Sequence, residues 1–308
     1  MELKIEKQTL IDKTEDTRGM ERASEQSRTF ALHGWVGLML IAIFWPINWF
    51  MGGLRTQWAF FPLWVGYCLT VDALVLLRKG TSLFERDWRK YIGLFLISAP
   101  VWWLFEGINW RLHNWVYDGG ELFTPFQFWF YATLSFTTVV PAVFGTAELV
   151  STFRWLKRVK RWVVIRPDRV TTLVFFVFGL IMLVSMWAWP KLFFPFVWLS
   201  VYFILEPINI WLGNRSMGDW TKNGDWRPVL ALWTGVLITG FFWEMWNYFS
   251  YPKWIYQIPW GSCCHLFEMP ILGYGGYLPF SLELFAVYHL VMGFLGQRKT
   301  HYVQIEPE

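Results

Sequence analysis

Apolar stretches of about 20 residues alternate with short polar segments along most of this 308-residue chain. The hydrocarbon core of a bilayer is roughly 30 Å thick, so a helix needs about 20 apolar residues to cross it. Eight stretches have this length, and they cover residues 30–50, 59–77, 91–110, 128–149, 170–189, 193–213, 229–249 and 277–296. The pattern predicts an all-α polytopic integral membrane bundle of about eight transmembrane helices.

Lys and Arg residues gather in alternate polar segments. The N-terminal segment, the second, fourth and sixth loops and the C-terminal tail together hold 23 of the 27. Because short cytoplasmic loops collect these residues, both termini are predicted to be cytoplasmic, most simply in the cell (inner) membrane. The net charge of +4 then follows from topology, so we expect no nucleic-acid partner. The expected partners are membrane lipids, with anionic headgroups as an alternative explanation for the basic loop at 151–169.

Composition supports a membrane protein without a cleaved leader. Apolar residues make up 55% of the chain and charged residues 16%, with a mean hydropathy of +0.32, whereas soluble domains carry about a quarter charged residues. The segment 1–28 has no apolar core, so we expect no signal peptide and a retained first helix. The three cysteines suggest no disulfide framework.

The two halves of the chain resemble each other. The segment FEGINW at 105–110 matches WEMWNY at 243–248, and WVY at 115–117 matches WIY at 254–256. Such matches predict two parallel four-helix repeats, related by an axis along the membrane normal. The predicted division is a cytosolic segment 1–29, a first repeat 30–150, a basic linker 151–169, a second repeat 170–296 and a cytosolic tail 297–308.

Five carboxylic acids fall inside the predicted helices without a deep Lys or Arg to neutralise them, namely Asp72, Glu106, Glu206, Glu244 and Glu283. Intramembrane charges are costly and usually face a bundle interior or a water-filled cavity. Without basic partners, these acids must share protons, stay protonated or hold a cation. Their depths indicate an inner layer with Asp72 and Glu206 and an outer layer with the other three.

A Glu-x-x-Asn spacing accompanies two of the outer acids, at Glu106–Asn109 and Glu244–Asn247. Residues at i and i+3 meet on one helix face, so each Asn is expected to orient its own carboxylate. With Glu283 as a supporting acid, these four residues are the candidate catalytic groups. The alternative is that polar groups of this kind only join helices through interhelical hydrogen bonds.

Aromatic residues concentrate on the helix ends that carry these acids. Tryptophan is abundant, with 24 residues, and an interfacial belt accounts for many of them. Ring faces near an acid can also stabilise a cation or line an apolar tunnel. The candidate substrate-binding residues are therefore Trp103, Trp110, Trp246 and Tyr248, together with the inner acids Asp72 and Glu206 and with His289, which is either a proton relay or a packing residue.

The last predicted outer loop is long and apolar, which is typical of a segment that re-enters the membrane or covers a cavity. His265 and Glu268 within it, with Cys264 nearby, are weak candidates for a metal site. No other cofactor is evident, and the chain lacks phosphate-binding Gly-Lys loops, zinc signatures and serine nucleophile motifs.

These features favour a membrane enzyme that performs acid–base chemistry on a lipid or isoprenoid in the outer half of the membrane. One alternative is a proton- or cation-coupled small-molecule transporter, which two repeats and proline-interrupted helices would suit. Another is a membrane assembly or scaffold protein. The CCHLFE segment at 263–268 has no counterpart in the first half, and this asymmetry favours the enzyme.

Overall fold

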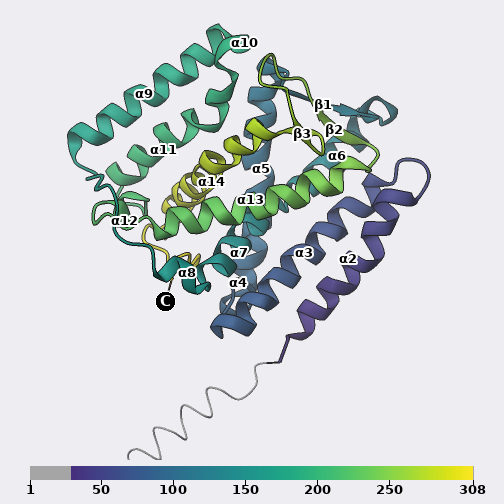
Figure 1. The fold of residues 1–308 in the computed structure, drawn as a ribbon, viewed down its shortest axis with the longest axis horizontal. Helices are drawn as coiled ribbons and strands as arrows, with labels where there is room; N and C mark the ends of the chain where they lie inside the picture. Colours follow the sequence, from purple (N-terminus) through teal and green to yellow (C-terminus); the bar gives the residue numbers. More distant parts are fainter. Residues whose placement is uncertain (1–28, 308) are drawn as a thin grey trace, which may run out of the picture.

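The computed structural model describes residues 29–307 (Figure 1). The predicted segment 1–29 lies outside this range except for Thr29. Within the described part, seven helices are long and apolar enough to cross a membrane, and a bent helix pair makes eight if it counts as one span. The prediction of an all-α polytopic membrane bundle is confirmed.

The described part of the first half contains six helices, one strand and one 3₁₀ turn. They are α2 (Leu32–Phe50), α3 (Thr56–Lys79), α4 (Leu83–Arg86), α5 (Trp88–Leu112), β1 (Trp115–Asp118), η1 (Gly120–Leu122), α6 (Pro125–Phe136) and α7 (Val139–Ser151). Helices α6 and α7 form one span. Thr137 and Thr138 lie between the two helices. Their hydroxyl groups donate hydrogen bonds to the backbone oxygens of Leu134 and Ser135, respectively, which satisfies polar groups where the helices meet.

The second half contains the remaining elements. They are α8 (Arg154–Lys157), α9 (Arg169–Ala188), α10 (Pro190–Phe193), η2 (Phe194–Trp198), α11 (Ser200–Trp211), α12 (Gly218–Thr221), α13 (Arg227–Tyr248), β2 (Lys253–Tyr256), β3 (His265–Leu266), β4 (Met269–Pro270), η3 (Ile271–Gly273) and α14 (Tyr274–Phe294).

Two helix pairs flank a central group of helices. The pair α2–α3 and the pair α9–α11 lie on opposite sides of the molecule, while α13 and α14 run between them and α13 packs on α7 (Figure 1). Helices α13 and α7 approach closely because Gly235 has no side chain. A Cβ atom at that position would lie 2.7 Å from the backbone nitrogen of Ala147. One turn away, Thr239 donates to Thr146 at 3.2 Å, so packing and a polar contact together fix the crossing.

The sixth apolar stretch is a broken helix. The sequence predicts one span over 193–213, but Pro190–Trp198 and Ser200–Trp211 meet at Leu199 with a bend of 42°. Pro195 lies in the 3₁₀ turn before the break and has no N–H to continue a helical ladder. Hydropathy is continuous across the break, so it gives no sign of the bend.

Strands β1 and β2 join the two halves. They pair antiparallel, with Trp115 opposite Tyr256, Val116 opposite Ile255 and Tyr117 opposite Trp254. The two matching Trp-x-Tyr segments therefore pair antiparallel, with their middle residues Val116 and Ile255 opposite each other. Two copies of one segment related by a twofold axis would pair in this same register. The duplication and the domain limits derived from it stay predictions.

Candidate functional site

An aromatic cavity lies where the β1–β2 pair meets the ends of α3, α5, α6, α13 and α14. Its volume is about 160 Å³, close to the roughly 150 Å³ of an engineered protein cavity that holds benzene. More than half of the lining residues are aromatic, compared with 21% of the whole chain. Five of them are tryptophans, Trp102, Trp115, Trp198, Trp243 and Trp254. The walls therefore present many ring faces to any molecule inside.

Glu106 lies behind one wall of this cavity and accepts three hydrogen bonds. The donors to its Oε1 atom are Trp102 Nε1 at 2.9 Å, Trp115 Nε1 at 3.0 Å and Tyr117 Oη at 2.5 Å. All three donors line the cavity. Trp102 lies one turn before Glu106 on α5, whereas Trp115 and Tyr117 come from β1. The carboxylate thus holds both the strand and the aromatic wall in place.

Glu244 lies behind another part of the cavity wall in a similar arrangement. Its Oε1 accepts from Tyr256 Oη at 2.8 Å and from Tyr277 Oη at 2.6 Å, and both phenols line the cavity. The residue is completely buried, and its Oε2 has no hydrogen-bond partner among residues 29–307. A buried unpaired carboxylate oxygen is costly. A proton on Oε2 would reduce this cost.

The two asparagines hold the strands and not the carboxylates. Asn109 donates to the backbone oxygen of Trp115 at 2.9 Å and accepts from the backbone N–H of Asn114 at 2.8 Å. Asn247 donates to the backbone oxygen of Trp254 at 2.7 Å and accepts from its N–H at 3.0 Å. We expected each Asn to form a hydrogen bond with its own glutamate. Each Asn instead binds backbone groups of the following strand, because those groups would otherwise be unpaired.

The predicted aromatic binding residues lie outside the cavity wall. Trp110 is 80% exposed on the outside of α5, and Tyr248 is 40% exposed against Phe249 and Phe267. Trp103 stacks on Trp129 and donates to Thr133. Trp246 is buried in an aromatic cluster with Trp45 and Trp64. Trp110 is thus a surface residue, and the other three pack against neighbouring rings.

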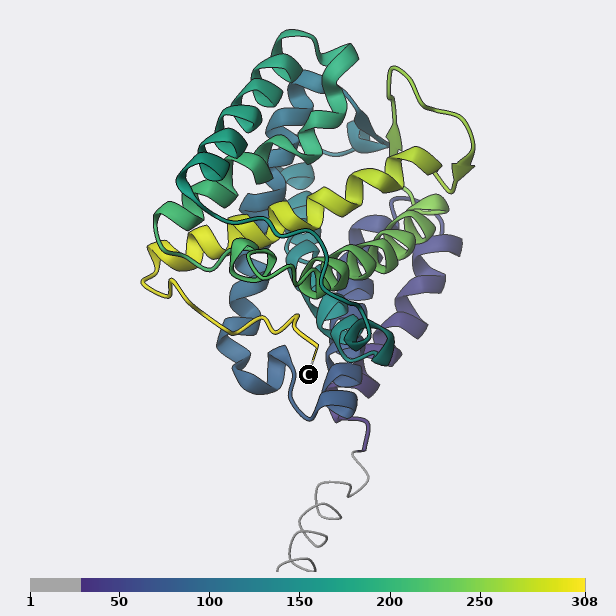
Figure 2. The ribbon, with the colours of Figure 1, turned by 60° about the vertical axis from the view of Figure 1, so that its left-hand side comes forward.

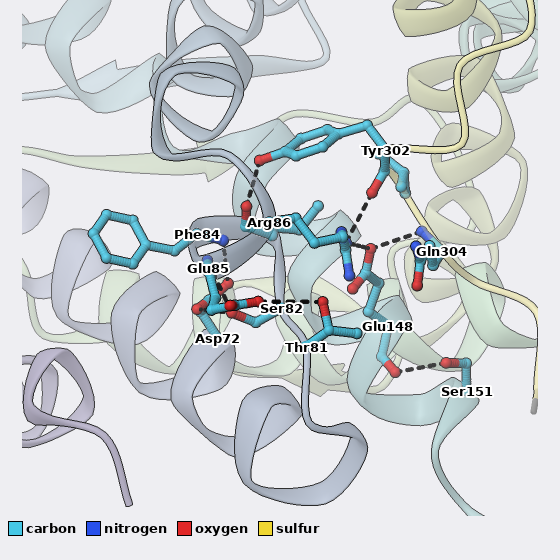
Figure 3. A network of polar contacts seen from close by, with 12 residues as sticks. Asp72, Thr81, Ser82, Phe84, Glu85, Arg86, Glu148, Ser151, Tyr302 and Gln304 are labelled. Atoms are coloured by element: carbon cyan, nitrogen blue, oxygen red, sulfur yellow. Dashed lines mark hydrogen bonds and ion pairs between the residues drawn. The ribbon is translucent and has the colours of Figure 1, made fainter.

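The inner acids hold loops at the other end of the bundle. Asp72 accepts from Ser82 Oγ at 2.6 Å and from the N–H of Phe84 at 3.0 Å, so it secures the start of α4 (Figure 3). His33 Nε2 lies 3.1 Å from the same carboxylate. Glu206 accepts from the N–H of Gly218 at 2.9 Å, at the start of α12. In both cases the carboxylate binds a backbone N–H 12 residues further along the chain.

The C-terminal tail packs into the bundle at this same end. Figure 2 shows it returning from α14 across the molecule. Arg86 contacts Glu148 at 2.5 Å and donates to the backbone oxygen of Tyr302 at 2.8 Å, while Gln304 N–H donates to Glu148 at 2.7 Å (Figure 3). Val303 is fully buried. The predicted cytosolic tail is therefore an integral part of the fold.

Glu283 and His289 are completely buried on α14, and neither forms a side-chain hydrogen bond with the residues that the structure describes. The Glu283 carboxylate faces the backbone N–H groups of Val201 and Tyr202, at the start of α11 just after the helix break. His289 packs against the rings of Phe285 and Tyr288. Glu283 is thus close to a half-helix N-terminus and away from the phenols of the aromatic cavity.

A second cavity opens between α9, α11 and α14. Its volume is about 380 Å³, and its wall includes Leu199, Tyr202 and Glu206. Trp198 lines the first cavity and the next residue, Leu199, lines the second. The helix break therefore separates the two cavities.

The weak metal candidates do not assemble. Cys264 and His265 are exposed, and Glu268 forms an ion pair with Lys253. Within residues 29–307, no group of three or more His, Cys, Asp or Glu side chains could hold a metal ion. The hairpin β3–β4 that carries these residues instead contributes Met269 to the cavity wall.

Sequence reasoning missed the cavity phenols that bind the two glutamates, which are Tyr117, Tyr256 and Tyr277. A signal for two of them exists in the repeated Trp-x-Tyr segment, which follows each Glu-x-x-Asn motif within about a dozen residues. Tyr277 has no such signal, because only the folded chain brings the start of α14 to Glu244. Comparison of the chain with protein-family models, curated proteins and solved structures gives no match.

Proposed function

We propose that this integral membrane protein is an enzyme that performs acid–base chemistry on an isoprenoid or another lipid inside the aromatic cavity. One observation carries the proposal: three of the four tyrosines that line the cavity donate a hydrogen bond to a glutamate behind its wall, either the half-buried Glu106 or the fully buried Glu244. The alternation of basic segments favours an orientation in which the cavity lies in the outer half of the membrane, with both termini in the cytoplasm.

A phenol that binds a carboxylate can transfer protons in either direction. Tyr256 can pass its proton to a substrate and recover one from a protonated Glu244, or take a substrate proton while its own moves to the carboxylate. Tyr117 and Glu106 offer the same pathway from the other wall. Two such pairs facing one cavity permit protonation at one point of a substrate and deprotonation at another, with no net use of protons.

The walls of the cavity suit an apolar substrate. Aromatic residues dominate them, and the volume of about 160 Å³ accommodates part of a lipid chain and little water. Low water content favours reactions through reactive intermediates, because it suppresses side reactions with water. In this proposal the membrane lipids expected as partners are therefore the substrates, and the chemistry needs no cofactor.

The test is mass spectrometry of lipid extracts from cells in which the gene is deleted, restored, or restored as Glu244→Gln. A lipid that disappears on deletion, returns with the wild type and stays absent with Glu244→Gln supports the enzyme. Trp110→Phe serves as the matched control, because Trp110 is exposed away from the cavity, and it should restore the lipid. Unchanged lipid profiles in all strains would contradict the proposal.

A proton- or cation-coupled transporter is the second candidate, and the helix break favours it. Cavities lie on both sides of the break at Leu199, and the buried Glu283 faces the N-terminal amides of α11. Broken helices with half-helix ends at a central site are common in transporters. Uptake into vesicles driven by a proton gradient, lost in Glu283→Gln and kept in Trp110→Phe, would support transport over catalysis.

A further inference from the structure

We infer that the substrate of the aromatic cavity is an alkene-bearing isoprenoid chain, and that the reaction passes through a carbocation formed by protonation of a double bond. This inference rests on the proposed function and narrows its substrate class. It depends on three features of the cavity: its charges, its ring faces and its size.

The charges around the cavity disfavour an anionic group and favour a cationic one. Lys253 is the only cationic side chain among the described residues that line the cavity, and Glu268 already neutralises it. A phosphate or carboxylate headgroup would therefore find no free cation inside. Within the described part of the chain, Glu106 and Glu244 receive hydrogen bonds only from neutral indoles and phenols. Positive charge that develops in the cavity would lie near two carboxyl groups without competing cations.

The aromatic ring faces of the cavity wall also favour a cationic group. A positive charge within about 6 Å of an aromatic ring face is attracted by its quadrupole, most strongly by tryptophan. Trp115 and Trp198 stack with their centroids 6.0 Å apart, and Trp243 and Tyr277 add two more rings to the wall. Such a wall stabilises a diffuse cation without bonding to it covalently, which protects a carbocation from capture.

The size limits what reacts inside the cavity. A volume of about 160 Å³ is near that of the cavity which holds benzene, so it accommodates about one five-carbon isoprene unit. The remainder of the chain would extend into the bilayer. A whole phospholipid headgroup with its glycerol does not fit this space.

The proposed step conserves atoms and charge. The cycle starts with Glu244 protonated and Glu106 ionised. The Tyr256 hydroxyl turns from Glu244 toward the substrate, gives its proton to one alkene carbon and takes the proton of the Glu244 carboxylic acid, which leaves a tertiary carbocation and an ionised Glu244. Tyr117 then takes a proton from a carbon next to the cation while its own proton moves to Glu106, and a new double bond forms. The product is a double-bond isomer. Proton return from Glu106 to Glu244 through water resets the site.

A stable ammonium ion that mimics the carbocation tests this inference. The probes are choline and its uncharged isostere 3,3-dimethyl-1-butanol, with binding to the full chain in nanodiscs measured by tryptophan fluorescence. We expect choline to bind at least tenfold more tightly than the isostere. We also expect Glu244→Gln and Tyr256→Phe to reduce that preference, and Trp110→Phe to keep it. Equal binding of the two probes to the wild-type protein would overturn the inference, even if a variant fails to fold.

Conversion in D₂O by isolated membranes separates this inference from the proposed function. If membranes with the wild-type protein convert the lipid that accumulates in the deletion strain, and the product carries a new deuterium at carbon, both hold. If the product forms without new deuterium at carbon, the carbocation pathway is wrong while the enzyme assignment survives. If no lipid depends on the gene, the proposed function itself fails.

Discussion

Trp115 and Tyr256 lie opposite each other in the β1–β2 pair, and each donates a hydrogen bond to a different glutamate. Trp115 binds Glu106 on α5, and Tyr256 binds Glu244 on α13. The two carboxylates are therefore linked through one cross-strand pair that lies in the wall of the aromatic cavity. Any change in the register of the two strands would disturb both acids at once.

Removing the phenol hydroxyls should reduce activity without unfolding the protein. In Tyr256→Phe and Tyr117→Phe each ring stays in place but loses its proton, so we expect formation of the product lipid to fall about 10²- to 10⁴-fold. The measurement is product formation in membranes with the lipid identified by profiling. Tyr248→Phe is the control, because Tyr248 lies outside the cavity. Full activity in both cavity variants would exclude the phenols as proton carriers.

The same two phenols should resist ionisation at high pH. Burial, followed by the neighbouring carboxylate, raises the pKa of Tyr117 and of Tyr256 well above 10. Because the folded state keeps protons that the unfolded state releases, their contribution to stability is complete below about pH 10 and falls as the pH rises further. The Tyr117→Phe and Tyr256→Phe double variant should match the wild type in its absorbance change at 295 nm up to about pH 10.5. In denaturant the wild type should show a larger absorbance change at 295 nm than the double variant, because its two additional phenols then ionise. A difference between the two folded proteins in this pH range would contradict the prediction.

The asparagines should matter for stability more than for chemistry. In Asn109→Ala the buried backbone groups of Asn114 and Trp115 lose their partners, which costs about 1–3 kcal/mol. Asn247→Ala should behave in the same way through Trp254. Thermal unfolding in detergent measures both, with Asn223→Ala in an exposed turn as the control. Midpoints equal to that of the control would show that the strands do not need these anchors.

The contact between Arg86 and Glu148 should be essential for folding. Glu148 is fully buried, so Arg86→Ala leaves an unpaired carboxylate and should cost about 3–5 kcal/mol. Adding Glu148→Gln to that variant removes the charge and should restore part of the loss. Lys90→Ala is the control, because its ion pair with Asp87 is solvent-exposed and worth at most about 1 kcal/mol. A loss that Glu148→Gln does not reduce would mean that charge is not the cause.

Cysteine labelling tests the predicted orientation. Cys263 and Cys264 are exposed in the loop beside the aromatic cavity, and Cys68 is buried in α3. A membrane-impermeant maleimide should label intact cells, and the variant Cys263→Ser with Cys264→Ser should lose the label. In that double variant, Lys222→Cys should react only after permeabilisation. The reverse pattern would place the cavity in the cytoplasmic half.

The fold class follows from the sequence because hydrophobic length is a local property. About 20 consecutive apolar residues suffice to predict a span, and the eight predicted stretches correspond to the seven helices and the bent pair of the described chain. The break at Leu199 was not predictable in this way, since its residues are as apolar as those of a continuous span. The packing of the tail was not predictable either, because Val303 becomes buried only through contacts with distant parts of the chain such as Arg215.

The sequence by itself determined that Glu106 and Glu244 lie in or at the ends of long apolar stretches and that an Asn follows each of them three positions later. Only the tertiary structure decided what those residues contact. The asparagines bind strand backbones, the carboxylates bind indoles and phenols, and Tyr277 reaches Glu244 across 33 positions of the chain. Helical periodicity predicts neighbours within one helix, whereas a hydrogen bond forms between groups that folding brings within about 3 Å, whatever their separation in sequence.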